Sequence, residues 1–231
     1  MELMYRIVLL VSMLALFANC SDEEDEPSQI PLRKRVTTTP LTAVLQKDSL
    51  RILDIGNSYT EDVTAFLPLV VGASGVDVSS VGLYRAVRGM GSFKSWYDCL
   101  HGRDDTPYSI TKVLGGIDSG IKQGDFKAGS GEAFRELLEQ NKWDVIILHQ
   151  VSTYAPYHEQ WFYHGAGGYL GELLSVITEL QPQALLGFYV VHSYWSDFPS
   201  NSEHSTFSRW QLTVNSVDYL VQSGICDIVI P

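Results

Sequence analysis

The alternation of short apolar runs with amphipathic stretches is the feature that most constrains the fold of this 231-residue chain. From residue 50 onward, each run short enough for a buried strand precedes a stretch whose apolar residues recur at helical spacing. We predict strands over about residues 51–55, 76–84, 143–149, 184–191 and 227–230, and helices over about 61–74, 92–101, 130–141, 165–180 and 204–223. This rhythm is typical of βαβ units around a parallel sheet. The fold we expect is an α/β, flavodoxin-like three-layer sandwich with a five-stranded parallel sheet in the order 2-1-3-4-5.

Residues 103–128 interrupt this rhythm. The stretches 108–113 and 121–123 are joined by Gly115-Gly-Ile-Asp-Ser-Gly120, which has a strong turn composition. We predict a hairpin insertion here. Shaping of substrate access and a plain surface hairpin are both open at this point.

The N-terminal segment has the features of a targeting sequence. One positive charge precedes the apolar stretch from Ile7 to Ala18, which is too short to span a bilayer securely, and Cys20 follows. Leu16-Phe-Ala-Asn-Cys20 resembles a relaxed bacterial lipobox, which implies a lipoprotein signal peptide over 1–20 and a lipid anchor on Cys20. An ordinary secretory peptide is the alternative.

An acidic run, Ser21-Asp-Glu-Glu-Asp-Glu26, follows directly. It resembles the signal that sends some Gram-negative lipoproteins to the outer face of the outer membrane. With several prolines behind it, the segment 21–48 is predicted to be a flexible tether. The remainder, 49–231, is expected to be one domain anchored to the membrane only through its lipid.

Composition excludes one large class of partners. The net charge of −11 and the absence of a basic stripe argue against nucleic-acid binding. No tight metal-ligand spacing surrounds His158 and His164, and no cofactor motif is present, so we expect neither a metal nor a cofactor. Cys99 and Cys226 form no disulfide framework, and their pairing stays open.

Gly56-Asn-Ser-Tyr-Thr60 lies where the first predicted strand ends and a helical pattern begins. A serine at a strand-to-helix turn is exposed above the sheet edge, beside helix amides that favour developing negative charge. Ser58 is therefore a candidate nucleophile. The alternative is that the segment only caps the helix.

Two further segments carry polar groups to the same edge. Gln150 and Ser152 follow the third predicted strand, whose end lies beside that of the first in a doubly wound sheet. The glycine-bracketed turn Arg88-Gly-Met-Gly91 precedes an amphipathic stretch and could direct the amide of Gly91 to the same place.

These blocks resemble the SGNH (GDSL-like) hydrolase superfamily over roughly residues 50–231, in a branch whose first block is G-N-S and whose third is Q-x-S. The resemblance implies that Ser58 is the nucleophile and that the Gly91 amide and the Gln150 side chain complete an oxyanion hole. The better known third block is G-x-N-D, and Gln in place of Asn keeps the amide donor. The resemblance brings no metal and no cofactor.

The family's D-x-x-H block, which supplies the general base and its orienting acid, is absent from this sequence. The domain 49–231 is therefore expected to lack its C-terminal part. His192, at the end of the fourth predicted strand, is the best internal candidate for the base. Alternation along a strand should send His149 and Gln150 to opposite faces, so that at most one of them points into the site.

Aromatic residues are plentiful after the third and fourth predicted strands, and flat rings suit sugars. We assign substrate contacts to Asn57, Ser152 and Trp195, and expect a glycan or other small-molecule ester as substrate. The leading hypothesis is a surface-exposed ester hydrolase acting on acylated carbohydrate. The alternatives are an inactive lipoprotein that binds glycans without turnover, and a truncated gene product.

Asp54 does not fit the pattern of a central strand. A carboxylate in a buried parallel strand is costly unless it is hydrogen-bonded. A local polar contact and relaxed selection are both open.

Overall fold

A computed structural model describes residues 43–44, 46–75, 77–104, 106–116, 120–126, 131–191 and 206–230, with the side chains from 209 onward in the last range. The predicted signal peptide with Cys20, nearly all of the predicted tether, and the candidates His192 and Trp195 lie outside these residues.

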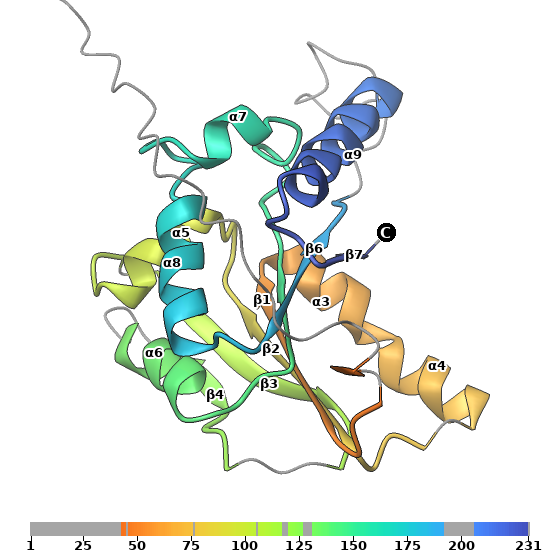
Figure 1. The fold of residues 1–231 in the computed structure, drawn as a ribbon. Helices are drawn as coiled ribbons and strands as arrows, with labels where there is room; N and C mark the ends of the chain where they lie inside the picture. The colour runs from red at the N-terminus through yellow and green to blue at the C-terminus, as the bar shows by residue number, and fades with distance from the viewer. Residues whose placement is uncertain are drawn as a thin grey trace, which may run out of the picture.

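A single sheet of seven strands, in the order β4-β3-β2-β1-β5-β6-β7, forms the centre of the described fold (Figure 1). The strands are β1 (Leu50–Gly56), β2 (Val81–Val87), β3 (Tyr108–Leu114), β4 (Gly124–Phe126), β5 (Val145–Leu148), β6 (Leu185–Tyr189) and β7 (Ile228–Ile230). The five strands from β2 to β7 in this order pair in parallel, whereas β3 and β4 are antiparallel. The α/β class is confirmed, but the prediction of a five-stranded sheet is wrong.

The two additional strands come from the segment predicted as a hairpin insertion. β3 pairs with the outer edge of β2, and β4 pairs with β3. An uncovered edge strand leaves a row of backbone N–H and C=O groups without partners, and the hairpin supplies those partners for β2. The hairpin is therefore part of the sheet.

The described helices follow the predicted ones with three differences. They are α3 (Ser58–Ala65), α4 (Leu67–Ser74), α5 (Phe93–Leu100), α6 (Gly131–Glu139), α7 (His158–Trp161), α8 (Leu170–Leu180) and α9 (Thr206–Gln222). The predicted helix over 61–74 divides at Phe66, because Pro68 in the first turn of α4 has no N–H to continue the ladder of α3. Helix α8 begins later than predicted, after Tyr169 in a left-handed conformation with φ 68°. The short α7 was not predicted.

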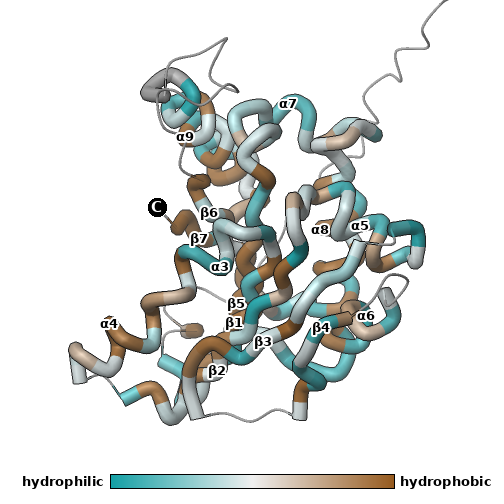
Figure 2. Tube along the Cα trace, turned by 180° about the vertical axis from the view of Figure 1, so that it is seen from behind, coloured by the Kyte–Doolittle hydropathy of each residue, from teal (hydrophilic) through white to brown (hydrophobic). Residues whose placement is uncertain are grey.

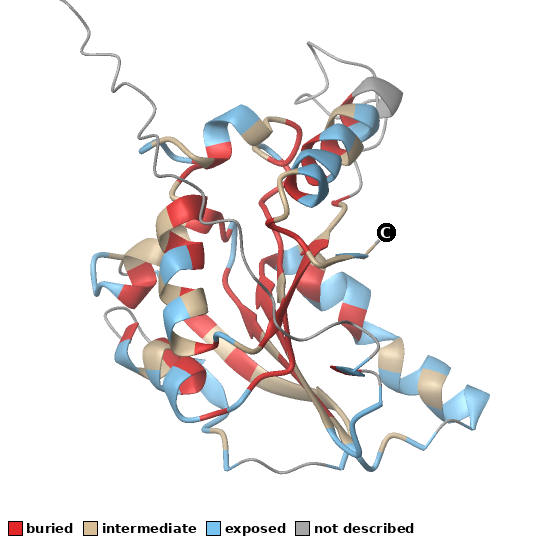
Figure 3. Ribbon diagram, in the orientation of Figure 1, coloured by how far each residue is buried: buried red, intermediate tan, exposed pale blue. Residues whose placement is uncertain are grey.

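The core lies on one face of the sheet. Leu53, Ile55, Ile146 and Leu148 on the central strands are buried with apolar residues of α5, α6 and α8, which lie together on one side in Figure 1. A smaller apolar cluster joins Val44, Val145 and Leu185. Helix α4 is strongly apolar along its trace (Figure 2), yet most of its residues are exposed (Figure 3).

Both cysteines of the described domain are buried and unpaired. Burial raises the pKa of the Cys99 thiol and of the Cys226 thiol to about 11 in each case. In the described part of the chain, no helix combines the length and the apolar character needed to cross a membrane.

Candidate active site

The turn between β1 and α3 presents Ser58 as predicted. Ser58 is exposed and is the first residue of α3. Asn57 is the N-cap: its side-chain oxygen accepts from the Tyr59 N–H at 3.1 Å, while the Asn57 N–H donates to Thr60 Oγ1 at 3.2 Å. This capping box fixes the turn and leaves Ser58 at the positive end of the helix.

Gly91 allows the second block to approach the first closely, and Gly56 allows the first block to turn tightly into α3. A Cβ on Gly91 would lie 2.7 Å from the Gly56 carbonyl oxygen, and one on Gly56 would lie 2.1 Å from Thr60 Oγ1. The side-chain N–H of Asn57 donates to the Gly91 carbonyl at 3.0 Å. The predicted contact between these blocks is thus made through Asn57, whose side chain is buried and bonded to protein at both polar atoms. These are the contacts of a positioning residue, and a substrate contact for Asn57 stays a prediction.

Arg88 anchors the loop that carries Gly91. Its backbone N–H donates to the Gly56 carbonyl at 3.2 Å, and its guanidinium donates to Ser95 O at 2.6 Å and pairs with Asp104 at 2.7 Å. Burial opposes ionisation of Asp104, but hydrogen bonds from the Thr106 backbone and from Arg88 hold the pKa of that carboxyl below its usual range. The backbone of Arg88 thus holds the second block against the first, and its buried guanidinium fixes the segment that follows.

The third block reaches the same region through the loop before α8. Gln150 is buried, and its Nε2 donates to Gly167 O at 2.7 Å. Ser92, next to Gly91, donates from its hydroxyl to Ala166 O at 3.1 Å. Two neighbouring carbonyls of one loop therefore connect the second and third blocks.

The two oxyanion donors that the resemblance implies besides the Ser58 amide already have acceptors within the protein. The Gly91 N–H donates to Arg88 O at 3.1 Å in a tight turn, and one N–H of Gln150 is used by Gly167. The amide of Ser58, at the start of α3, has no intrahelical acceptor because of its position. A site with all three donors directed at one point would require the turn at Gly91 to open.

Asp54 and His149 form a buried contact that the sequence did not reveal. His149 Nε2 lies 2.8 Å from Asp54 Oδ1, and both side chains are buried. The distance is that of an ion pair, but the two atoms are not aligned as a hydrogen bond. Of the alternatives for Asp54, the polar contact is the one observed. The sequence did contain a hint of this contact, because an acidic residue inside one predicted strand and a histidine at the end of a neighbouring one are both unusual.

The other predicted contact residues fall in two groups. Ser152 is buried near Gln150, and its carbonyl accepts from Arg209 of α9 at 3.2 Å. Trp195 and His192 lie outside the described residues. Among the aromatic residues after β5, Trp161 is buried and donates from its indole N–H to Tyr154 O at 2.8 Å, which is a packing role.

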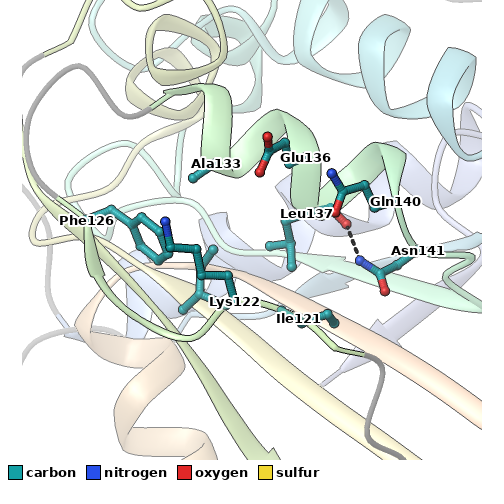
Figure 4. Close-up of a pocket in the computed structure, with 9 residues that line it drawn as sticks. Ile121, Lys122, Phe126, Ala133, Glu136, Leu137, Gln140 and Asn141 are labelled. Atoms are coloured by element: carbon teal, nitrogen blue, oxygen red, sulfur yellow. Dashed lines mark hydrogen bonds between the residues drawn. The ribbon is translucent and has the colours of Figure 1, made fainter.

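A shallow pocket lies elsewhere, between the β3–β4 hairpin and α6 (Figure 4). It is lined by Ile110, Ile121, Lys122, Phe126, Ala133, Glu136, Leu137, Gln140 and Asn141. None of these is a predicted site residue. Within the described residues, no cluster of three or more His, Cys, Asp or Glu side chains could hold a metal ion.

Comparison with known proteins gives a likeness of fold. No family model and no curated protein matches the sequence. Among solved structures, the chain is similar to a DUF4886 family protein from Bacteroides uniformis, with a TM-score of 0.59 and 18% identity over 80% of this chain and 67% of that one. The salicylyl-acyltransferase SsfX3 from a tetracycline biosynthetic pathway matches with a TM-score of only 0.37 and 12% identity, over 80% of this chain and 43% of that one.

Proposed function

We propose that this protein is a serine ester hydrolase of the SGNH type that deacylates carbohydrate esters. The observation that supports this most is a series of three hydrogen bonds: Asn57 to Gly91, Ser92 to Ala166, and Gln150 to Gly167. These bonds gather three separate segments of the sequence beside an exposed serine at a helix N-terminus. Such convergence of a nucleophile with amide groups is what acyl transfer needs.

In this proposal the Ser58 hydroxyl oxygen attacks the ester carbonyl carbon and gives its proton to a base. The tetrahedral oxyanion accepts from the Ser58 N–H, and from the Gly91 and Gln150 N–H groups once they are released. The C–O bond to the sugar then breaks, the sugar oxygen takes the proton, and water hydrolyses the acyl-serine. His192 stays the candidate base.

A flavodoxin-like arrangement of the sheet and an outer-membrane location belong to the same proposal. The parallel order β2-β1-β5-β6-β7 supports a flavodoxin-like arrangement with a hairpin added at one edge. The signal peptide, the lipid on Cys20 and the outer-membrane location rest on the sequence pattern alone. Together they describe an enzyme anchored by lipid at the cell surface.

Reaction of the full chain with a fluorophosphonate probe, followed by intact-mass analysis, tests the proposal. One adduct per chain that disappears in Ser58→Ala is the expected result, because only an activated serine reacts rapidly. Absence of an adduct on protein with a cooperative thermal transition would overturn the proposal.

The role of Gln150 is tested by its replacement with alanine. Loss of one oxyanion donor should cost about 3 kcal/mol of transition-state stabilisation, or roughly 100-fold in kcat. Hydrolysis of p-nitrophenyl acetate measures this directly. Gln183→Ala is the control, since that half-buried amide donates to Trp143 O at the opposite end of the sheet. A Gln150→Ala variant as fast as the parent would remove Gln150 from the mechanism.

A second function is glycan binding without turnover. It is favoured because the N–H groups of Gly91 and Gln150 already donate to protein carbonyls and so are not free to bind an oxyanion. It predicts that an acetylated oligosaccharide binds with equal affinity to the parent and to Ser58→Ala in calorimetry, with no acetate released. Release of acetate by the parent would exclude it.

A further inference from the structure

The sheet face beneath α3 carries a row of charged and polar side chains. In the strand register, Asp54 of β1 lies opposite Arg85 of β2 and Ile147 of β5. His149 follows β5, two residues after Ile147, and its backbone N–H donates to Ile55 O at 3.0 Å. Because side chains alternate along a strand, Asp54, Arg85 and His149 share one face.

The ring of His149 is held on three sides. A Cβ on Gly56 would lie 2.6 Å from the Cβ of His149, so the histidine packs directly against the backbone of the elbow. The other contacts are a stack on Tyr189, with ring centroids 4.6 Å apart, and the 2.8 Å approach of Nε2 to Asp54 Oδ1. Gly56, which lies two residues before Ser58, is therefore flanked by an imidazole whose orientation is fixed.

The buried pair is not explained by a contribution to the stability of the fold. His149 is 1% exposed and Asp54 is 4% exposed. Neither ring nitrogen nor Asp54 Oδ1 has an aligned hydrogen bond among the described residues. Buried charged or polar pairs are often no better for stability than apolar residues of similar volume, and their best supported advantage is a unique arrangement.

The charged and polar groups around the pair come from three further elements, β2, α3 and β6. Arg85 donates to Thr64 Oγ1 of α3 at 2.9 Å and lies 3.7 Å from Glu61. Tyr189 of β6 has a raised pKa, caused by burial and then by the Asp54 charge. The pair thus lies between a cation bound to α3 and a half-buried tyrosine.

We propose that Asp54 and His149 are a positioning pair for Ser58: the carboxylate orients the imidazole, and the imidazole fixes Gly56 and the capping box of α3. This role rests on the proposed function, although its structural part does not. A pair of leucines would fill the volume without a polar contact between the strands, and cores repacked in this way lose a unique arrangement before they lose stability.

The test compares His149→Leu, His149→Gln and the double variant Asp54→Leu/His149→Leu by their rates of fluorophosphonate labelling at Ser58. His149→Leu should label about tenfold more slowly or worse, because small misplacements of reacting groups have large effects on rate. His149→Gln keeps a polar donor within reach of Asp54 and should stay within about threefold of the parent. The double variant should regain the parent's unfolding midpoint but still label about tenfold more slowly.

His164→Leu is the matched control, since that imidazole also pairs with a carboxylate, Glu172 at 2.6 Å, but lies at the surface. It should label at the parental rate. Parental labelling by the double variant would overturn the proposal, since the pair would then be structural only.

Hydrogen exchange separates failure of this inference from failure of the proposed function. The amides of Asn57, Tyr59 and Thr60, which are bonded within the elbow, should exchange about tenfold faster in the double variant. If they do so while no form labels, the positioning pair stands and the hydrolase proposal falls. Unchanged exchange in the double variant would overturn the pair whether or not Ser58 reacts.

Discussion

The two faces of the sheet differ in what they bury. One face packs Leu53, Ile55 and Ile146 against α5, α6 and α8 without a charged group in the cluster. The other carries the buried Asp54 and His149 and the half-buried Arg85 beneath α3, beside an apolar cluster of three buried residues. The same strands therefore build two different faces. One stabilises the fold, and the polar groups of the other are better explained by a need to hold the turn from Gly56 to Thr60 in one arrangement.

The first prediction concerns the apolar face. Phe134→Ala should lower the free energy of unfolding by about 3–5 kcal/mol, because the side chain is fully buried and its loss leaves a cavity. Urea unfolding followed by circular dichroism measures it. Phe66→Ala, at a 68% exposed position, is the control and should change little. A loss below about 1 kcal/mol for Phe134→Ala would show that the apolar face is not the main source of stability.

The second prediction concerns the thiols of the apolar face. In the folded chain burial raises the pKa of Cys99 and of Cys226 from 9.0 to about 11. Between these values the unfolded chain loses protons that the folded chain keeps, so the stability contribution is complete below pH 9.0 and is lost as pH rises towards about 11. The decline should be of the order of 1–2 kcal/mol per thiol.

Urea unfolding at several pH values measures this decline, and Cys99→Ala/Cys226→Ala should reduce it. The pKa of Tyr108 is raised by burial and then by the charge of Cys99, so its burial should leave part of the alkaline decline in the variant. The same alkaline slope in parent and variant would show that the thiols are not its source.

The third prediction concerns the smaller apolar cluster. Val44 is 1% exposed and packs with Val145 and Leu185. Val44→Ala removes two methyl groups and should lower the free energy of unfolding by about 1.5 kcal/mol, less than Phe134→Ala. If thermal unfolding gives an equal loss for both, the two faces contribute alike and the comparison fails.

Much of the fold was predictable because the central strands are local apolar runs. β1, β5, β6 and β7 lie within two residues of their predicted limits. β2 was predicted over 76–84 and lies at Val81–Val87, since Arg85 interrupts the apolar pattern while its charge is used by Thr64 and Glu61 of α3. The hairpin strands were missed as members of the sheet because edge pairing leaves no mark in either segment alone.

In the site, too, the local features were predictable from the sequence and the contact between distant segments was not. The elbow at Ser58 is a contiguous motif, so its turn, cap and helix follow from neighbouring residues. The contact between Asp54 and His149 depends on the register of β1 with β5, whose residues are far apart in sequence. Alternation correctly separates His149 from Gln150, but it does not say that Asp54 will lie beneath the histidine.

The smallest expected effect concerns α4, the apolar helix that follows α3. Leu69 is 70% exposed, so Leu69→Gln removes little buried area and should change the free energy of unfolding by less than about 0.5 kcal/mol. Urea unfolding at low protein concentration measures this change. A loss as large as that of Val44→Ala would mean that Leu69 is buried in solution, and that the face beneath α3 and α4 has a larger apolar component than the described contacts contain.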